Sequence, residues 1–144
     1  MNSIWNTSLG IMARREHSVR ELKDKLAKRF PEDESEIDKV ILRLQDLGLQ
    51  SDSRFAELWF RSQTSRGRGP VRIRGEARLK GIETQTNLLL EDCDVDWYEK
   101  ALELVQRKFP AGLTYQTKAK AYRFLSYRGF ESNSIQYAIN AIAE

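Results

Sequence analysis

The sequence predicts an all-α protein built from three tandem three-helix repeats, which together form an elongated, curved helical array. Apolar residues recur at helical spacing along most of the chain, without a convincing strand-like alternation. In addition, "PVRIRGEARLKGIET" and "KAKAYRFLSYRGFES" align without gaps, which pairs Arg72 with Lys120 and Gly81 with Gly129 at a separation of 48 residues. Such a period is typical of tandem helical arrays, in which we expect each repeat to need its neighbours to bury its apolar face.

The 144 residues fit one continuous domain, which we divide into repeats at 1–50, 51–93 and 94–144. A third similar segment, "SVRELKDKLAKRFPE", needs a shift of one residue to match Leu22 with Ile73. Aromatic residues recur upstream of the three segments, at Trp5, Phe55 and Trp97.

In the first repeat, Ser18 and Glu21 form a capping box that predicts a helix over about 19–29. A second helix follows Pro31 and ends at Gly48, with acids in its first turn and apolar residues at Ile37, Val40, Ile41, Leu44 and Leu47. The first dozen residues match little, so the opening helix is the least defined element.

In the second repeat, Ser51 and Asp52 cap a helix whose apolar face we expect to carry Phe55, Leu58, Trp59 and Ser62. The glycines of "RGRG" end this helix, and Pro70 suits the first position of the next one. Further helices are predicted over 84–92, 96–109, 115–128 and 132–143, the last with Ile135, Ala138, Ile139 and Ile142 in register.

Composition argues for a cytoplasmic protein without catalytic machinery. No 18-residue apolar stretch and no basic leader before an apolar run are present, so we expect neither membrane spanning nor export. Cys93 is the only cysteine and His17 the only histidine, which removes the usual metal clusters and hydrolytic triads. We therefore expect no metal, no cofactor and no enzymatic activity, and interpret His17 as a helix-junction residue.

Two short motifs resemble ligand loops without meeting their requirements. "RGRGP" lacks the Gly-Lys-Ser/Thr ending of a nucleotide-binding loop. The acids of "DCDVDWYEKALE" are spaced like a calcium loop, but Trp97 stands where the sharp turn needs glycine. We expect Asp94 or Asp96 to cap the following helix instead.

Charge is unevenly distributed along the chain. The formal net charge is +3, yet residues 61–80 hold seven lysines and arginines and the single acid Glu76. The remaining residues therefore carry a net charge of −3. Such clustering favours a polyanionic or acidic partner that meets one region of the surface.

Within this stretch, Arg74 and Arg78 lie one helical turn apart and have no acid three or four residues away. They form, with Arg66 and Arg68, an unpaired cluster suited to carboxylates or phosphates. Arg72, Glu76 and Lys80 form a second row, which is either a solvated salt-bridge ridge or part of the contact. The predicted partner-binding residues are Arg66, Arg68, Arg72, Arg74, Arg78 and Lys80.

Several stretches closely resemble the RecX regulatory proteins over residues 9–140: "ARREHSVRELKDKL", "VILRLQDLGLQSDSRFAE", "SRGRGPVRIRGEARLKGI" and "RFLSYRGF" followed by "IQYAI". The resemblance implies a cytoplasmic modulator of the RecA recombinase that binds the RecA nucleoprotein filament, in its groove or at its end, and restrains its ATPase, strand-exchange and coprotease activities. One departure from the family is Gly75, which should cost about 1 kcal/mol of helix stability relative to alanine.

An alternative is a direct DNA-binding module that places residues 70–81 in the major groove, in the manner of a helix-turn-helix protein. Few Asn, Gln and Ser residues occur on that helix, which weakens base reading but leaves phosphate contact open. We expect a monomer whose partner is the RecA filament, with weak binding to single- or double-stranded DNA and no membrane contact.

Overall fold

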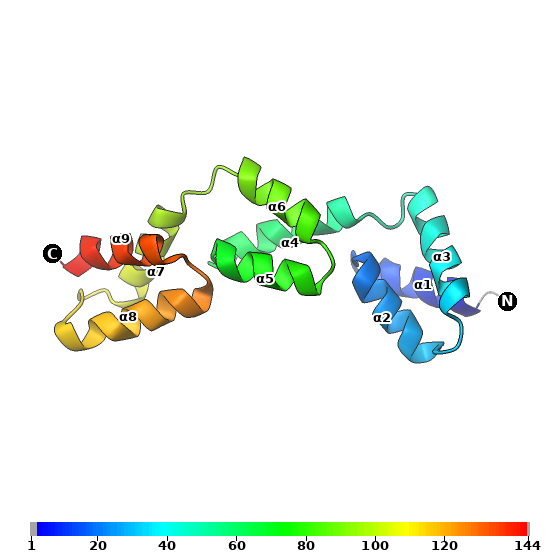
Figure 1. Cartoon of the computed structure of the whole chain (residues 1–144), viewed down its shortest axis with the longest axis horizontal. Coiled ribbons are helices and arrows are strands. Elements are labelled where there is room, and N and C mark those ends of the chain that lie inside the picture. Colours follow the sequence, from blue (N-terminus) through cyan, green and yellow to red (C-terminus); the bar gives the residue numbers. More distant parts are fainter. Residues whose placement is uncertain (1–2, 144) are drawn as a thin grey trace.

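The computed structural model describes residues 3–143, and within that range it contains nine α-helices and no strand (Figure 1). The predicted all-α class is therefore confirmed. In chain order the helices are α1 (Ser3–Arg14), α2 (Val19–Arg29), α3 (Glu34–Asp46), α4 (Asp52–Ser65), α5 (Pro70–Leu79), α6 (Glu83–Asp92), α7 (Trp97–Lys108), α8 (Tyr115–Arg128) and α9 (Ser132–Ala143).

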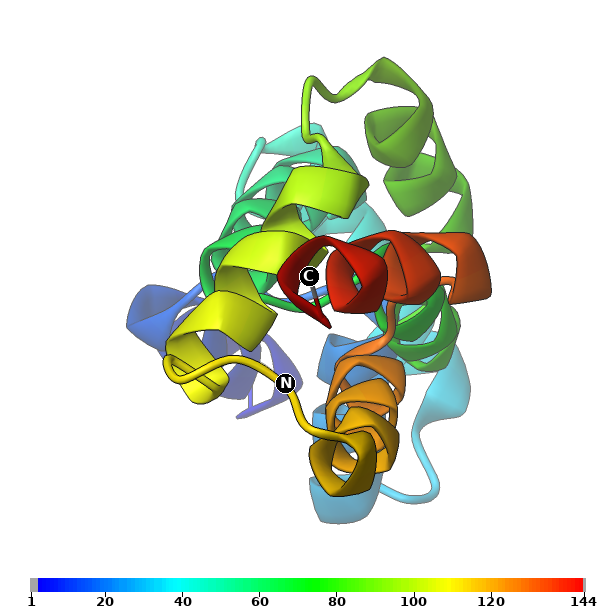
Figure 2. The same cartoon turned by 90° about the vertical axis from the view of Figure 1, so that its left-hand side faces the viewer.

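The helices pack in three groups of three that follow one another along the long axis of the molecule (Figure 1). Helices α1, α2 and α3 pack together, α6 packs on α4 and α5, and α9 packs on α7 and α8. Viewed from the end that holds the C-terminus, the third group lies in front of the other two (Figure 2). The elongated array of three three-helix repeats is thus confirmed.

Each repeat has its own hydrophobic core. Buried side chains gather in three clusters, and each cluster draws its members from a single repeat. Fully buried residues such as Leu22, Ile82 and Leu125 therefore lie in cores built within single repeats, and the expectation that a repeat needs its neighbours to bury its apolar face stays a prediction. Repeats meet through their turns and helix ends.

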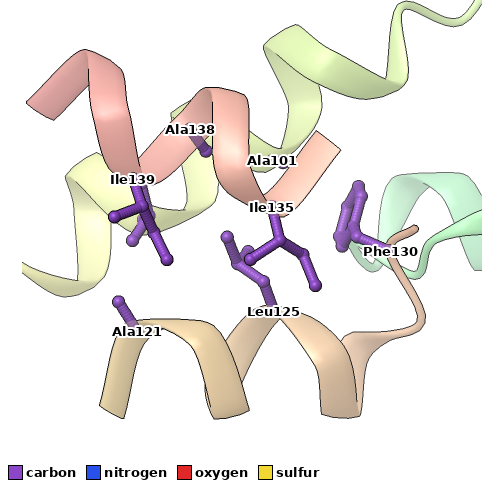
Figure 3. Close-up of a cluster of buried hydrophobic side chains, with 8 residues drawn as sticks. Ala101, Ala121, Leu125, Phe130, Ile135, Ala138 and Ile139 are labelled. Atoms are coloured by element: carbon purple, nitrogen blue, oxygen red, sulfur yellow. The ribbon is translucent and has the colours of Figure 1, made fainter. Parts of the chain in front are cut away.

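The third core shows how such short helices fill their interior (Figure 3). Ala101, Ala121 and Ala138 are fully buried, and these small side chains let their helices approach closely. Leu125 and Ile135 fill the space between α8 and α9. The ring of Phe130 closes one end of the cluster and meets Trp97 edge to face at a centroid distance of 6.5 Å.

Most of the local signals act as predicted. Ser18 and Glu21 form a capping box at the start of α2, and Ser51 caps α4. Asp96 accepts hydrogen bonds from the backbone of Tyr98 and Glu99 at the start of α7. Gly48 has φ +74°, a left-handed conformation that ends the helical run after α3.

Two details differ from the prediction. On α4 the buried residues are Phe55, Ala56, Phe60 and Gln63, whereas Leu58 remains 47% exposed. The buried face is therefore rotated from Leu58 toward Phe60, whereas Trp59 is half-buried and packs against the same core. Helix α6 begins at Glu83, and α7 covers Trp97–Lys108 rather than 96–109.

Among residues 3–143, no helix has the length and hydropathy needed to cross a membrane.

Candidate partner-binding surface

The arginine-rich stretch forms the turn between α4 and α5. Helix α4 ends at Ser65, and Gly67 follows with φ +77°. Gly69 is the residue before the first turn of α5 and Pro70 opens that turn, as predicted. The glycines therefore separate two helices and do not form a phosphate-cradling loop.

This turn also docks the second repeat onto the third. The backbone N–H groups of Gly69 and Val71 donate to the carbonyls of Arg128 and Gly129, at 2.8 and 2.9 Å. The Arg128 guanidinium returns across the junction and donates to the carbonyl of Arg66 at 2.9 Å. Part of the stretch singled out by its charge is thus structural.

Gly69 is needed here for its lack of a side chain. A Cβ on Gly69 would stand 2.5 Å from the carbonyl oxygen of Gly129, which is closer than real Cβ contacts occur. Backbone therefore meets backbone at this junction. The start of α5 lies against the end of α8 without an intervening side chain.

Arg72 lies at the same junction. Its Nε donates to Glu76 at 2.9 Å, which confirms the predicted i, i+4 pair. Its guanidinium also stands 5.2 Å from the ring centroid of Tyr127 and donates to the Tyr127 carbonyl at 3.4 Å. Arg72 therefore connects the second and third repeats.

The interpretation of Arg74 and Arg78 as unpaired cations is wrong. Arg74 lies 3.7 Å from a carboxylate oxygen of Glu131, and Arg78 donates to Glu83 at 2.9 Å. Neither acid lies three or four residues from its arginine along the helix. Glu131 comes from the third repeat, and Glu83 lies beyond the turn that follows α5. The pairs are exposed, and exposed pairs contribute only about 0–1 kcal/mol. An incoming anion can therefore replace either acid.

Lys80 does not complete the row with Arg72 and Glu76. Its Nζ instead donates to Glu21 of the first repeat at 3.1 Å. Burial raises the pKa of the Glu21 carboxyl, but hydrogen bonds from Arg15, Lys80 and the Ser18 backbone outweigh burial and hold the pKa below its ordinary value of 4.5. Lys80 thus belongs to the junction between the first and second repeats.

The two remaining predicted residues differ in exposure. Arg68 is half-buried and donates to the side chain of Gln63 at 3.1 Å. Arg66 is exposed at the end of α4. The six predicted residues therefore do not form one cluster, since four lie near the start of α5, Arg78 lies toward its end, and Lys80 faces the first repeat.

The first junction, between the first and second repeats, is held by side-chain hydrogen bonds and ion pairs. The second junction, between the second and third repeats, includes the backbone hydrogen bonds of Gly69 and Val71. Asp52 accepts a hydrogen bond from the Val19 N–H at 2.9 Å, and Arg54 pairs with Glu16 at 2.6 Å. Gln50 donates to the carbonyl of His17 at 3.2 Å. Polar contacts of this kind hold the first repeat to the second.

His17 is a junction residue, as predicted. It is 1% exposed, with Nδ1 3.0 Å from the Arg15 carbonyl and Nε2 2.8 Å from the Lys25 ammonium. Burial lowers the pKa of His17 below its ordinary 6.5, the bond to the Arg15 carbonyl raises it, and the charges of Arg15 and Lys25 lower it again. The net decrease favours a neutral ring that donates to Arg15 and accepts from Lys25.

Three helices that are distant in sequence form one basic side of the molecule, which a running charge window does not detect. Helices α8, α5 and α2 follow one another end to end along one side of the molecule, in the reverse of chain order (Figure 1). Together they carry twelve lysines and arginines against three acids, whereas α3, α6 and α9 carry two against seven. A charge count for each predicted helix, in place of a running window, would have found this separation.

Two of the third-position helices, α3 and α6, thus carry more acids than cations, and the middle helices form what we call the basic row, α8–α5–α2. At about 1.5 Å per residue the row spans roughly 50 Å. Clustered charge along such a length attracts an extended polyanion or an acidic protein surface.

Comparison with known proteins agrees with this architecture. Models described as the first, second and third three-helix domains of RecX match residues 5–44, 51–86 and 94–139. The regulatory protein RecX of Halorhodospira halophila is 37% identical over 99% of this chain and 89% of its own length. That of Cronobacter sakazakii is 40% identical over 92% of this chain and 88% of its own length.

Solved structures show the same fold. The crystal structure of RecX from Lactobacillus salivarius superposes with a TM-score of 0.79 and 23% identity, covering 98% of this chain and 95% of that one. A second crystal structure, of a regulatory protein RecX, superposes with a TM-score of 0.77 and 20% identity. It covers 95% of this chain and 70% of that one. Because the three domain matches together cover most of its length, the chain belongs to the RecX family of regulatory proteins.

Proposed function

We propose that the protein modulates the RecA recombinase by binding the RecA nucleoprotein filament, in its groove or at its end. In this role it restrains the ATPase, strand-exchange and coprotease activities of RecA and catalyses no reaction itself. The relatives are named regulatory proteins, which supports a binding role over an enzymatic one. The proposal places the protein in the cytoplasm and treats it as a monomer.

One observation supports the proposal most directly, namely the basic row. A row of roughly 50 Å matches an elongated partner better than a compact one. Arg74 and Arg78 lie on its central helix with 43% and 70% of their side chains exposed. Their present acidic partners contribute little, so a carboxylate or phosphate of the filament can take their place.

The alternative of a helix-turn-helix reader gains no support from the geometry. Such proteins place the N-terminal residues of the recognition helix in the major groove. In this chain the first residues of α5 are occupied, because Gly69 and Pro70 are buried and Val71 bonds to the third repeat. Base contact by the first residues of α5 would therefore require the contact between the second and third repeats to separate.

The test is inhibition of the DNA-dependent ATPase of RecA, with co-sedimentation on preformed filaments as the binding measurement. Wild-type protein should lower the ATPase rate, and Arg74→Ala/Arg78→Ala should weaken both inhibition and co-sedimentation. Lys39→Ala/Arg43→Ala, which removes the same charge from α3 outside the basic row, is the matched control. If wild-type protein neither binds filaments nor changes the ATPase rate, the proposed function is wrong.

A further inference from the structure

A cationic cavity lies where the second repeat meets the third. It has a volume of about 420 Å³ and lies between the end of α4, one face of α7 and one face of α8. Five cations line it, with Glu103 as the one acid among the lining residues: Arg66, Lys100, Arg107, Lys108 and Arg128. Within residues 3–143 none of the five forms an ion pair with an acid.

Two cations of this cavity are held in place without being neutralised. Arg128 donates to the Arg66 carbonyl at 2.9 Å, and its guanidinium stands 5.2 Å from the ring centroid of Phe124. The Lys108 ammonium lies 5.5 Å from the same centroid. A carbonyl and an aromatic ring position these groups, but neither removes their charge.

At Gly67 the wall of the cavity has little room for a side chain. Gly67 lines it with φ +77°, and a Cβ there would stand 3.1 Å from Leu104 and 3.3 Å from the Arg128 guanidinium. The turn that opens the arginine-rich stretch therefore also shapes this site. Guanidinium groups suit a phosphate, because their planar forks match its oxygens, and the guanidinium of Arg128 is held in place beside the cavity.

Helix α8, which forms one wall of the cavity, also carries cations and aromatic rings outside it. Helix α8 has no acid, and Lys120, Phe124 and Arg128 follow one another at i, i+4 and i+8 along one of its ridges. Arg123 and Tyr127 lie beside that ridge, and Tyr127 is 77% exposed. Cations that alternate with exposed aromatic rings are typical of surfaces that bind single-stranded nucleic acid, where phosphates meet the cations and bases stack on the rings.

We propose that the cavity holds a backbone phosphate of single-stranded nucleic acid, and that the adjoining face of α8 receives the neighbouring nucleotides. This inference goes beyond the proposed action on RecA and does not require RecA. An acidic peptide would also meet the cations, but the exposed tyrosine beside them favours an aromatic base as the neighbouring group.

The experiment measures fluorescence anisotropy of a labelled oligothymidylate of 20 nucleotides across a salt series, with the full chain and no RecA. Lys100→Ala/Arg107→Ala removes two lining cations that form no ion pair and no cation–π contact within residues 3–143. Lost contacts between charged groups should raise the Kd by about tenfold. Each lost contact to a single strand should flatten the slope of log affinity against log salt by about 0.7. Circular dichroism verifies the fold of each variant.

Lys39→Ala/Arg43→Ala is again the matched control, and it should keep the wild-type affinity and slope. A labelled decaglutamate peptide provides the competing arm. The proposal is overturned if the Lys100→Ala/Arg107→Ala variant binds the oligonucleotide with wild-type affinity and slope, or if it loses only peptide binding. This experiment contains no RecA, so a negative result leaves the proposed action on RecA untouched. A negative result in the ATPase test likewise leaves the proposed nucleic-acid site untouched.

Discussion

Gly129 lies against Arg72 so closely that a Cβ on the glycine would stand 2.3 Å from the Arg72 Cβ. The same relationship recurs one repeat earlier, where a Cβ on Gly81 would stand 2.9 Å from the Cβ of Arg20. Both glycines occupy equivalent positions in the 48-residue alignment of the second and third repeats. One kind of close contact therefore joins successive repeats.

Gly129→Ala should destabilise the protein by more than the backbone strain alone. Gly129 has φ +98° and Gly48 has φ +74°, but only Gly129 has a neighbour within 4 Å of the added Cβ. We expect Gly48→Ala to cost about 1 kcal/mol and Gly129→Ala about 2–4 kcal/mol, measured by urea unfolding. Equal losses would mean that the approach of Arg72 to Gly129 contributes nothing.

Gly75→Ala should have the opposite effect. Gly75 lies within α5, and a Cβ added there meets nothing within 4 Å. Because alanine restricts the unfolded chain and favours the helix, we expect a gain of about 1 kcal/mol in the free energy of unfolding. Gly10 in α1 offers the same open space and serves as a second example. A thermal unfolding scan in which neither variant melts higher than wild type would contradict this expectation.

Acidification should destabilise the first junction through His17. The folded-state pKa of His17 lies below its ordinary 6.5, so the unfolded chain binds more protons and stability falls as pH decreases through and below about 6.5. Glu21, whose folded pKa lies below 4.5, loses its contribution only at lower pH. His17→Gln should flatten the free energy of unfolding between pH 7.5 and 5.5. Parallel profiles for the two proteins would rule out this role of His17.

The ion pair between Lys80 and Glu21 should be stronger than the pair between Arg78 and Glu83. The first pair is 31% and 16% exposed, whereas the second is 70% and 45% exposed. Double-mutant cycles with Lys80→Ala/Glu21→Gln and Arg78→Ala/Glu83→Gln isolate each coupling. We expect about 1 kcal/mol for the inner pair and less than about 0.5 kcal/mol for the outer one. The reverse order would show that burial does not control these contacts.

The fold was predictable from the sequence because its signals are local. Capping at Ser18 and Asp96 and the stop at Gly48 each act within one helical turn. The candidate site was less predictable because its partners are distant in sequence. Arg74 pairs with Glu131 and Lys80 with Glu21, and no spacing rule along one helix can find such partners.

The cationic cavity was missed for the same reason. Its lining comes from three segments, and of its five cations only Arg66 belongs to the stretch that a running charge window selects. The separate cores were missed because periodicity reports which residues are buried but not which helix covers them. The boundaries between repeats, placed after residues 50 and 93, stay a prediction.

The hydrogen bonds at the second junction also have an electrical consequence. The C-terminal carbonyls of a helix carry partial negative charge and the N-terminal N–H groups of the next carry partial positive charge, and here Arg128 and Gly129 accept from Gly69 and Val71. The two helix dipoles therefore add head to tail, so that α8 and α5 act as one longer dipole. Its positive pole lies at the start of α8 near Tyr115, which adds to the attraction that the acid-free helix already exerts on an approaching anion.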